Sequence, residues 1–236
     1  PSPTPSGTQS RGARWRTAMR THWGALAVGA IFLALALYYN VTVPLWESDN
    51  EWAHYQYARY ITLNHSLPRP DTQIALPPSS DLCQVIPATG LTTVHQFRQP
   101  PLYYLLGSVV LSSFDVRNDL PVISNPHIRT PQSQDDHNVV VHTDAEDFPY
   151  RGPVLAVHAL RLLSAMIGLA GLAAAYLSGL LLFPRRILAV AMMAVNAFIP
   201  QYVLSSAAVN NDILVGALGA WCAFLCLWFL LRKANP

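Results

Sequence analysis

Residues 162–184, LLSAMIGLAGLAAAYLSGLLLFP, contain no acidic residue, lysine or arginine. Three other stretches share this property, namely residues 23–46, 187–211 and 213–231. A helix crosses the roughly 30 Å apolar core of a bilayer with about 20 apolar residues, so each stretch is long enough to span it. Only 12% of the residues are charged, about half the usual share in soluble domains. The sequence therefore predicts an all-α membrane protein with four transmembrane helices.

The basic residues outside the long segment between the first two spans predict the topology. Eight of them fall on one face of a four-span chain: Arg11, Arg14, Arg16, Arg20, Arg185, Arg186, Arg232 and Lys233. Lysine and arginine accumulate in cytoplasmic loops, so we expect this face to be cytoplasmic. Residues 101–114 form a shorter apolar stretch. If this stretch also crossed the membrane, the last four of these basic residues would lie on the outer face. Its length suits an interfacial helix instead.

These patterns predict the following organisation. A disordered cytoplasmic tail covers residues 1–22, spans cover residues 23–40, 154–183, 187–209 and 213–231, and a cytoplasmic end covers 232–236. A large extracytoplasmic loop, residues 41–153, carries interfacial helices near 48–63 and 101–114, irregular chain over 67–93 and a short strand at 139–141. The second span is longer than a bilayer needs, so its first turns should protrude and expose His158 and Arg161.

Polar chemistry is concentrated in the large loop, which holds twelve of the 13 acidic residues. The densest group is Glu47, Asp49, Glu51 and His54, directly after the first span. Acids beside aromatic residues at a membrane surface are partly desolvated, which raises their proton affinity and suits a general base. Two other interpretations stay open. The acids could complement a helix dipole, or Asp49, Glu51 and His54 could hold a divalent cation.

A second motif is the run HQFRQPPLYY at residues 95–104, with looser matches at 161–164 (RLLS), 200–201 (PQ) and 209–212 (VNND). Together with the acids after the first span, it resembles the GT-C class of membrane glycosyltransferases, which includes protein O-mannosyltransferases and lipid A aminoarabinose transferases. The resemblance implies transfer of a sugar from a polyprenyl-phosphate carrier to an acceptor on the outer face, with inversion. Members of this class usually have more than four spans, so we expect the chain to be an N-terminal portion.

The same resemblance implies roles for individual residues. An acid of the first outer loop deprotonates the acceptor, with Asp49 the first candidate and Glu51 the second. Relatives often carry adjacent Asp-Glu, whereas here Asn50 separates the two acids. The lipid phosphate needs cations, and arginine pairs phosphate oxygens bidentately. The predicted substrate-binding residues are His54, Arg98, Gln99, Tyr103 and Arg161.

Simpler interpretations exist for some of these side chains. Arg161 could snorkel to the membrane interface, and an aromatic belt is the favoured interpretation of Tyr103 and Tyr104. No resident cofactor is predicted, and a divalent metal remains the open alternative.

The expected partners are the lipid bilayer, the polyprenyl-phosphate-linked sugar and an acceptor of open chemistry, with no nucleic acid. We expect the protein in a bacterial plasma membrane. Two other functional classes compete with a glycosyltransferase. One is a transporter or channel subunit, which the scarcity of ionisable residues in the spans disfavours. The other is a non-catalytic membrane protein whose outer loop binds an envelope glycan or a partner protein.

Overall fold

The computed structural model describes residues 11–48, 50–77, 91–125 and 138–234, with the backbone alone over 11–20 and 233–234. In these ranges the α-helices are α1 (Arg11–Thr42), α2 (Glu51–Asn64), α3 (Leu102–Leu111), α4 (Gly152–Leu182), α5 (Arg186–Ala197), α6 (Pro200–Ser206) and α7 (Asp212–Ala234). The short elements are the strands β1 (Gln73–Ala75) and β2 (Leu91–Thr93) and the 3₁₀ helices η1 (His95–Arg98) and η3 (Asp144–Glu146).

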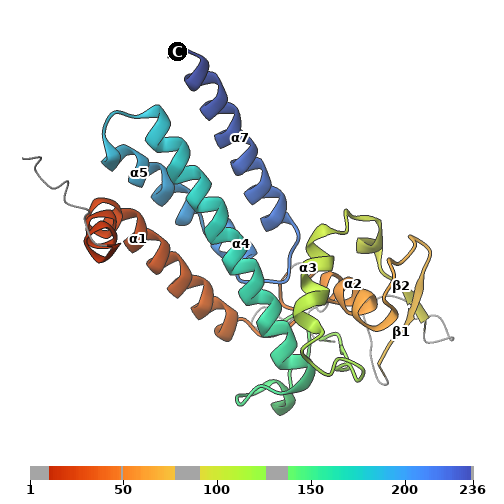
Figure 1. Cartoon of the computed structure of the whole chain (residues 1–236). Coiled ribbons are helices and arrows are strands. Elements are labelled where there is room, and N and C mark those ends of the chain that lie inside the picture. The colour runs from red at the N-terminus through yellow and green to blue at the C-terminus, as the bar shows by residue number, and fades with distance from the viewer. Residues whose placement is uncertain (1–10, 49, 78–90, 126–137, 235–236) are drawn as a thin grey trace, which may run out of the picture.

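Helix α4 is the central element of a bundle that also contains α1, α5, α6 and α7 (Figure 1). It contacts each of these helices and α3 as well. Small residues make this possible, because a glycine lets a neighbouring backbone approach closely. Gly168, Gly171 and Gly179 are buried on α4. Each of them faces a neighbouring helix at a distance that leaves no room for a side chain.

Gly179 has the tightest backbone contact of the three and leads to a test. A Cβ atom added there would lie 2.7 Å from Cα of Ala189 on α5. We expect Gly179→Ala to lower the free energy of unfolding in detergent by about 1–3 kcal/mol, because the clash is with backbone and cannot relax by a side-chain rotation. Gly216→Ala on α7 is the matched control, since a Cβ atom added to Gly216 would meet nothing within 4 Å. Equal stability of the two variants would contradict the close α4–α5 packing.

Three helices of the described residues are long and apolar enough to cross a membrane: Thr21–Thr42 of α1, Gly152–Leu182 and Asp212–Arg232. They are compatible with an integral membrane protein. The predicted third span, residues 187–209, is divided into α5 and α6, which bend by 68°. Pro200 begins α6, and a proline has no N–H and clashes with the preceding turn, so a straight helix cannot run through it. Counting the bent pair as one span brings the total to four at most.

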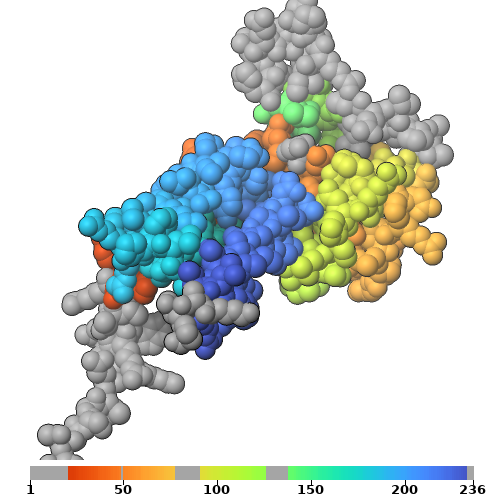
Figure 2. All heavy atoms as spheres, turned by 90° about the horizontal axis from the view of Figure 1, so that it is seen from above, coloured from red at the N-terminus to blue at the C-terminus, as the bar shows by residue number. Residues whose placement is uncertain are grey.

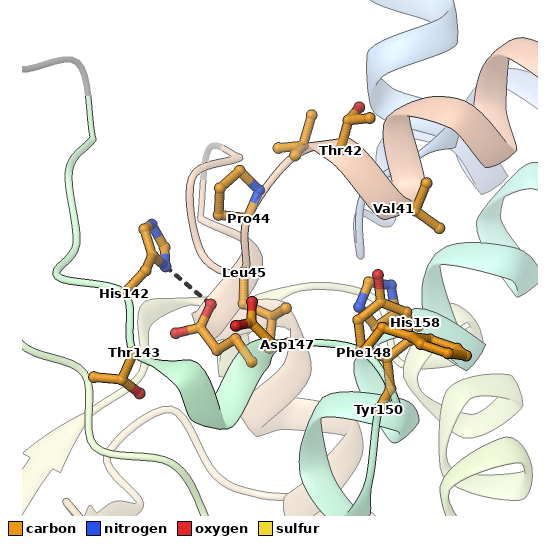
Figure 3. A pocket seen from close by; sticks show the side chains of 12 residues that line it. Val41, Thr42, Pro44, Leu45, His142, Thr143, Asp147, Phe148, Tyr150 and His158 are labelled. Carbon is orange, nitrogen blue, oxygen red and sulfur yellow. Dashed lines mark hydrogen bonds and ion pairs between the residues drawn. The ribbon is translucent and has the colours of Figure 1, made fainter.

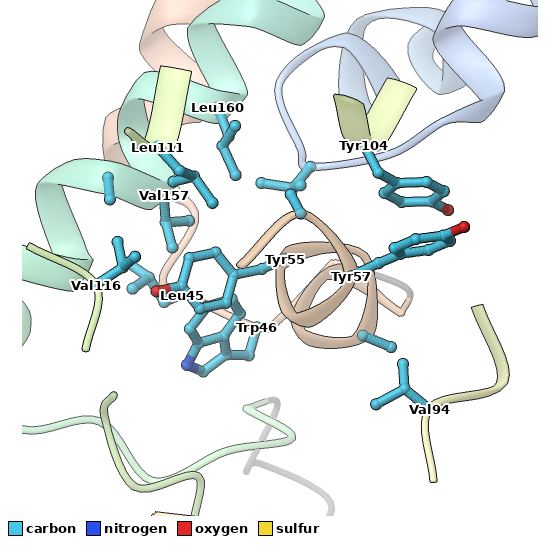
Figure 4. Packing of buried hydrophobic residues seen from close by; sticks show 14 of the residues in the cluster. Leu45, Trp46, Tyr55, Tyr57, Val94, Tyr104, Leu111, Val116, Val157 and Leu160 are labelled. Atoms are coloured by element: carbon cyan, nitrogen blue, oxygen red, sulfur yellow. The ribbon is translucent and has the colours of Figure 1, made fainter. Parts of the chain in front are cut away.

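The described parts of residues 43–151 form a layer, called here the loop layer, at one end of α1 and α4. Its helices α2 and α3 and its strands lie together beside the bundle (Figures 1 and 2). A continuous apolar cluster joins the layer to α4, with Tyr55, Leu111 and Leu160 all 0% exposed (Figure 4). Each such side chain contributes roughly 1.5–3 kcal/mol on burial, so the layer is packed onto the bundle and does not project freely.

The interior of the loop layer differs from the sequence-based expectation. Strands β1 and β2 pair antiparallel, with Gln73 opposite Thr93, where irregular chain was predicted. The predicted strand at 139–141 is present only as an isolated bridge between Ser124 and Val140. The prediction that His158 and Arg161 are exposed is wrong, since their exposed fractions are 8% and 0%. The loop layer folds over the first turns of α4 and covers both side chains.

Candidate functional site

A buried ion pair between Glu51 and Arg161 lies where α2, α4 and the α6–α7 connection meet. Both side chains are 0% exposed. Nε of Arg161 donates to Oε1 of Glu51 at 2.7 Å, and Nη2 donates to Oε2 at 2.6 Å. This forked geometry is the strongest arrangement that an arginine and a carboxylate can form. It connects two helices that are far apart in the sequence.

The remaining donors of Arg161 bind the last turn of α1 and the chain that follows it. Nη1 donates to the carbonyl oxygens of Asn40 and Val43, at 2.9 and 2.7 Å, and Nη2 donates to that of Pro44 at 2.9 Å. An arginine has five N–H groups, and all five have partners here. Arg161 therefore ends α1 in a defined direction, and no donor of its guanidinium is left for a phosphate in this structure.

The carboxylate oxygens of Glu51 also all have hydrogen-bond donors within the protein. Besides Arg161, its carboxylate accepts hydrogen bonds from the backbone N–H groups of Trp46 at 3.1 Å and Val209 at 2.9 Å. Breaking one partner of such a pair would leave an uncompensated buried charge, which is strongly unfavourable. The predicted roles of Glu51 as a base and Arg161 as a phosphate ligand stay predictions. The geometry described here is that of a joint between α1, α2, α4 and the α6–α7 connection.

The segment that leads into α2 is strained. Trp46 has φ 68° and Asn50 has φ 56°, both in the left-handed region that side-chain-bearing residues seldom adopt. Such residues cost roughly 1–3 kcal/mol each and gather at functional sites. The N–H of Trp46 bonds to Glu51, and its ring packs on Tyr55 with centroids 5.3 Å apart, which offsets the strain. Asp49, the first candidate for the general base, belongs to this segment and lies outside the described residues.

A cavity of about 300 Å³ is lined by Ser48, the residue that precedes Asp49. It is called the polar cavity here. Gln201 and Ser205 of α6 and Asn210 of the α6–α7 connection also line it, together with Glu47. Hydroxyl and amide groups around a concave surface suit a ligand that both donates and accepts hydrogen bonds. The looser motifs at 200–201 and 209–212 thus reach the same cavity as the acidic segment.

Glu47 anchors a different part of the loop layer. Its carboxylate accepts hydrogen bonds from the backbone N–H groups of Val139 and Val140, at 2.8 and 3.0 Å, and Nε2 of His142 lies 2.9 Å from Oε1. Nδ1 of His142 in turn lies 2.9 Å from Glu146. Glu47 therefore ties the chain that precedes η3 to the segment after α1.

His54, Tyr104 and Gln99 form a hydrogen-bonded chain in the loop layer. The Tyr104 hydroxyl donates to Oε1 of Gln99 at 2.5 Å, and its oxygen lies 2.8 Å from Nδ1 of His54. Tyr57 stacks on the Tyr104 ring with centroids 3.9 Å apart. Burial is the largest cause that raises the pKa of Tyr104, and the nearby Asp212 adds to it. The hydroxyl therefore stays protonated and remains a donor at neutral pH.

Tyr103 is buried, whereas Arg98 is exposed to solvent. Tyr103 is 1% exposed, and its hydroxyl lies 2.7 Å from Oγ of Ser164 and accepts from the N–H of Asn210 at 3.2 Å. Burial raises the pKa of Tyr103 as well. Arg98 is exposed at the end of η1. The structure thus brings His54 and Gln99 together through Tyr104, whereas the two arginines predicted to bind phosphate do not share an exposed surface.

The divalent-cation alternative rests on Asp49, Glu51 and His54. Within the described ranges, which exclude Asp49, no group of three or more His, Cys, Asp or Glu side chains is arranged to hold a metal ion. Both carboxylate oxygens of Glu51 are taken by nitrogen donors.

Two residues of this region were not predicted from the sequence. Tyr57 lies three residues after His54 and so shares its helix face, which is a signal that could have indicated it. Asn40 is the polar residue at the end of the predicted first span, residues 23–40, and its carbonyl oxygen accepts from Arg161. Only the fold shows that α4 passes beside it.

Comparison of the chain with protein-family models, with curated proteins and with solved structures finds no match.

Proposed function

We propose that this chain is part of a membrane glycosyltransferase that uses a polyprenyl-phosphate-linked sugar. In this proposal α5 and α6 together form one broken span, so that four spans cross a bacterial plasma membrane with the N-terminus in the cytoplasm. The loop layer then lies on the outer face. The exposed apolar side chains of α3, among them Leu102 and Val109, suit a helix that rests on the membrane surface.

One observation carries the proposal: the buried Glu51–Arg161 pair holds the strained residues Trp46 and Asn50 close in sequence to Glu47 and Ser48, which line the polar cavity. Strained backbone conformations persist at active sites when the surrounding packing holds them in place. Every hydrogen-bonding group of this ion pair has a partner within the protein. Such a pair can hold one catalytic carboxylate in place beside a cavity with hydroxyl and amide groups. Asp49 belongs to the same stretch of sequence, so we assign it the role of general base, and we assign Glu51 and Arg161 the role of positioning residues.

The proposed reaction is a single displacement. The acceptor hydroxyl loses its proton to the Asp49 carboxylate while its oxygen attacks the anomeric carbon of the donor sugar. The bond between that carbon and the phosphate oxygen breaks, and its electron pair leaves with the polyprenyl phosphate. Configuration at the anomeric carbon is inverted. Arg98 is exposed and is the cation that we assign to the phosphate, because Arg161 is fully used within the protein.

Sugar transfer in proteoliposomes tests the proposal against its two rivals. The full chain is reconstituted with a polyprenyl phosphate that carries a radiolabelled sugar, and donor consumption is followed with candidate acceptors present. We expect the labelled donor to decrease and free polyprenyl phosphate to accumulate. Uptake of soluble labelled substrate without donor consumption would instead favour a transporter. Glycan binding with neither uptake nor consumption would favour a non-catalytic binding protein, and either result overturns the proposal.

A further inference from the structure

A second cavity, of about 200 Å³, lies beside the chain that leaves α1 (Figure 3). It is called the His158 cavity here. Its walls come from the end of α1, from residues 142–150 and from the first turns of α4. Its volume is far above the roughly 10–15 Å³ that one ordered water needs, so it has room for a ligand of several heavy atoms. It shares only Val43 with the polar cavity.

His158 supplies a buried acceptor at the wall of this cavity. The side-chain amide of Asn40 donates to the carbonyl oxygen of His158 at 3.2 Å, which orients the amide. Its oxygen then lies 2.7 Å from Nδ1 of His158 and must accept a hydrogen bond from that nitrogen. In the neutral imidazole the proton is therefore on Nδ1, and Nε2 carries the lone pair. His158 is 8% exposed, and among the described residues Nε2 has no hydrogen-bond partner.

The side chains around this acceptor are aromatic and acidic. Tyr150 stacks on the imidazole with centroids 3.9 Å apart, and Phe148 packs edge-on against Tyr150 at 5.7 Å. Phe148 is 83% exposed although it is apolar. Asp147 lines the same cavity and is exposed, so its carboxylate is accessible to a ligand. Figure 3 shows Asp147 and His158 on either side of the space beside Leu45.

We propose that the His158 cavity binds a saccharide ring. One ring hydroxyl donates to Nε2 of His158, a second donates to the Asp147 carboxylate, and an apolar face of the ring packs against Phe148. Nε2 is shielded from solvent, so we expect the side chains that cover it to reorient on binding. This site is separate from the polar cavity and does not depend on the proposed transferase activity.

The chemistry of the wall favours a sugar over other small ligands. Nε2 of His158 and the Asp147 carboxylate are acceptors, and the cavity is also lined by Thr143 and Tyr150, whose hydroxyl groups can donate or accept. The ligand therefore needs several groups that both donate and accept hydrogen bonds, and each sugar hydroxyl does both. A buried neutral acceptor also needs a partner, because an unsatisfied polar atom is unfavourable away from water. A primary amine would pair with Asp147, but its charge would be poorly solvated against Val41, Leu45 and Phe148.

Titration of the full chain in nanodiscs with simple glycosides tests this proposal. The probes are the methyl α-glycosides of glucose, mannose and galactose, with ethanolamine as the amine probe. Binding is followed by the ¹⁵N resonance of Nε2 in histidine-labelled protein, where His158→Phe identifies the signal. We expect at least one glycoside to bind saturably with a dissociation constant of about 1–10 mM and to shift this resonance. A structural role for His158 alone would leave the resonance unchanged.

Variants of exposed residues test the proposal without disturbing the folded structure. Asp147→Asn and Phe148→Ala should each weaken glycoside binding about tenfold, because a hydrogen bond to a charged group or a stacking face is lost. Asp144→Asn, an exposed residue of the same segment that does not line the cavity, should leave the affinity unchanged. No saturable binding of any of the three glycosides at about 100 mM would overturn the proposal. So would unchanged affinity in both variants, or binding of ethanolamine alone.

Discussion

Arg161→Met is expected to lower the free energy of unfolding by about 3–5 kcal/mol. The substitution leaves the Glu51 carboxylate buried without a cation, and it removes the donors of three backbone carbonyl oxygens. Removal of one partner of a buried pair is among the most destabilising changes known for ionic groups. Equilibrium unfolding in mixed micelles by SDS titration measures the effect. Arg186→Met, at the exposed start of α5, is the matched control and should change stability by less than about 0.5 kcal/mol.

Two further variants separate charge from geometry in this pair. Arg161→Lys keeps the charge but has one nitrogen in place of three, so it cannot make both bonds to Glu51 and also reach Asn40, Val43 and Pro44. We expect it to remain clearly destabilised. Glu51→Gln combined with Arg161→Met should cost less than the sum of the two single changes, since no unpaired charge is left buried. Wild-type stability of Arg161→Met would show that the pair is not the joint described here.

Asp49→Asn is expected to lower the rate of sugar transfer by about 10²–10⁴-fold while leaving the unfolding free energy nearly unchanged. The range is the usual contribution of a general base, and asparagine cannot take the acceptor proton. Donor consumption in proteoliposomes gives the rate, and SDS titration of the same preparations gives the stability. Asp71→Asn, an exposed acid elsewhere in the loop layer, is the control for loss of one negative charge.

Glu51→Gln distinguishes the two acids. It should lower transfer and stability together, because it weakens the hold of the protein on the segment that carries Asp49. A base assignment to Asp49 requires that only Asp49→Asn reduces the rate in a fully folded protein. If Asp49→Asn transfers sugar at the wild-type rate, the assignment is wrong, and a rate loss confined to Glu51→Gln would transfer the role to Glu51.

The helices could be predicted because their signal is local. A charge-free stretch of sufficient length is visible without knowledge of its neighbours, and α4 and α7 begin and end within two or three residues of the predicted spans. The break between α5 and α6 was missed, although Pro200 stood in the predicted span as a signal for it. The pairing of β1 with β2 was also missed, because each strand has only three residues and its partner lies across an intervening segment.

Part of the candidate site was predicted from residue types together with the family resemblance. The acids after the first span and the motif at 95–104 led to Glu51, His54 and Gln99, and the structure places these side chains in one layer. What each one contacts could not be read from the chain. Glu51 and Arg161 were predicted for separate tasks, and the structure pairs them with each other.

The sequence by itself determined where membrane-compatible helices lie and where polar residues gather, since both depend on composition along a short segment. Only the tertiary structure decided which polar groups form hydrogen bonds and ion pairs with one another. A buried charge has to find its partners wherever the fold brings them, and Arg161 finds them in α2 and in the chain that leaves α1. The apolar run at 162–184 is thus more than a stretch that is long and apolar enough to cross a membrane. Its helix begins ten residues earlier, at Gly152, and the residue directly before the run is Arg161, the buried cation that joins the loop layer to the bundle.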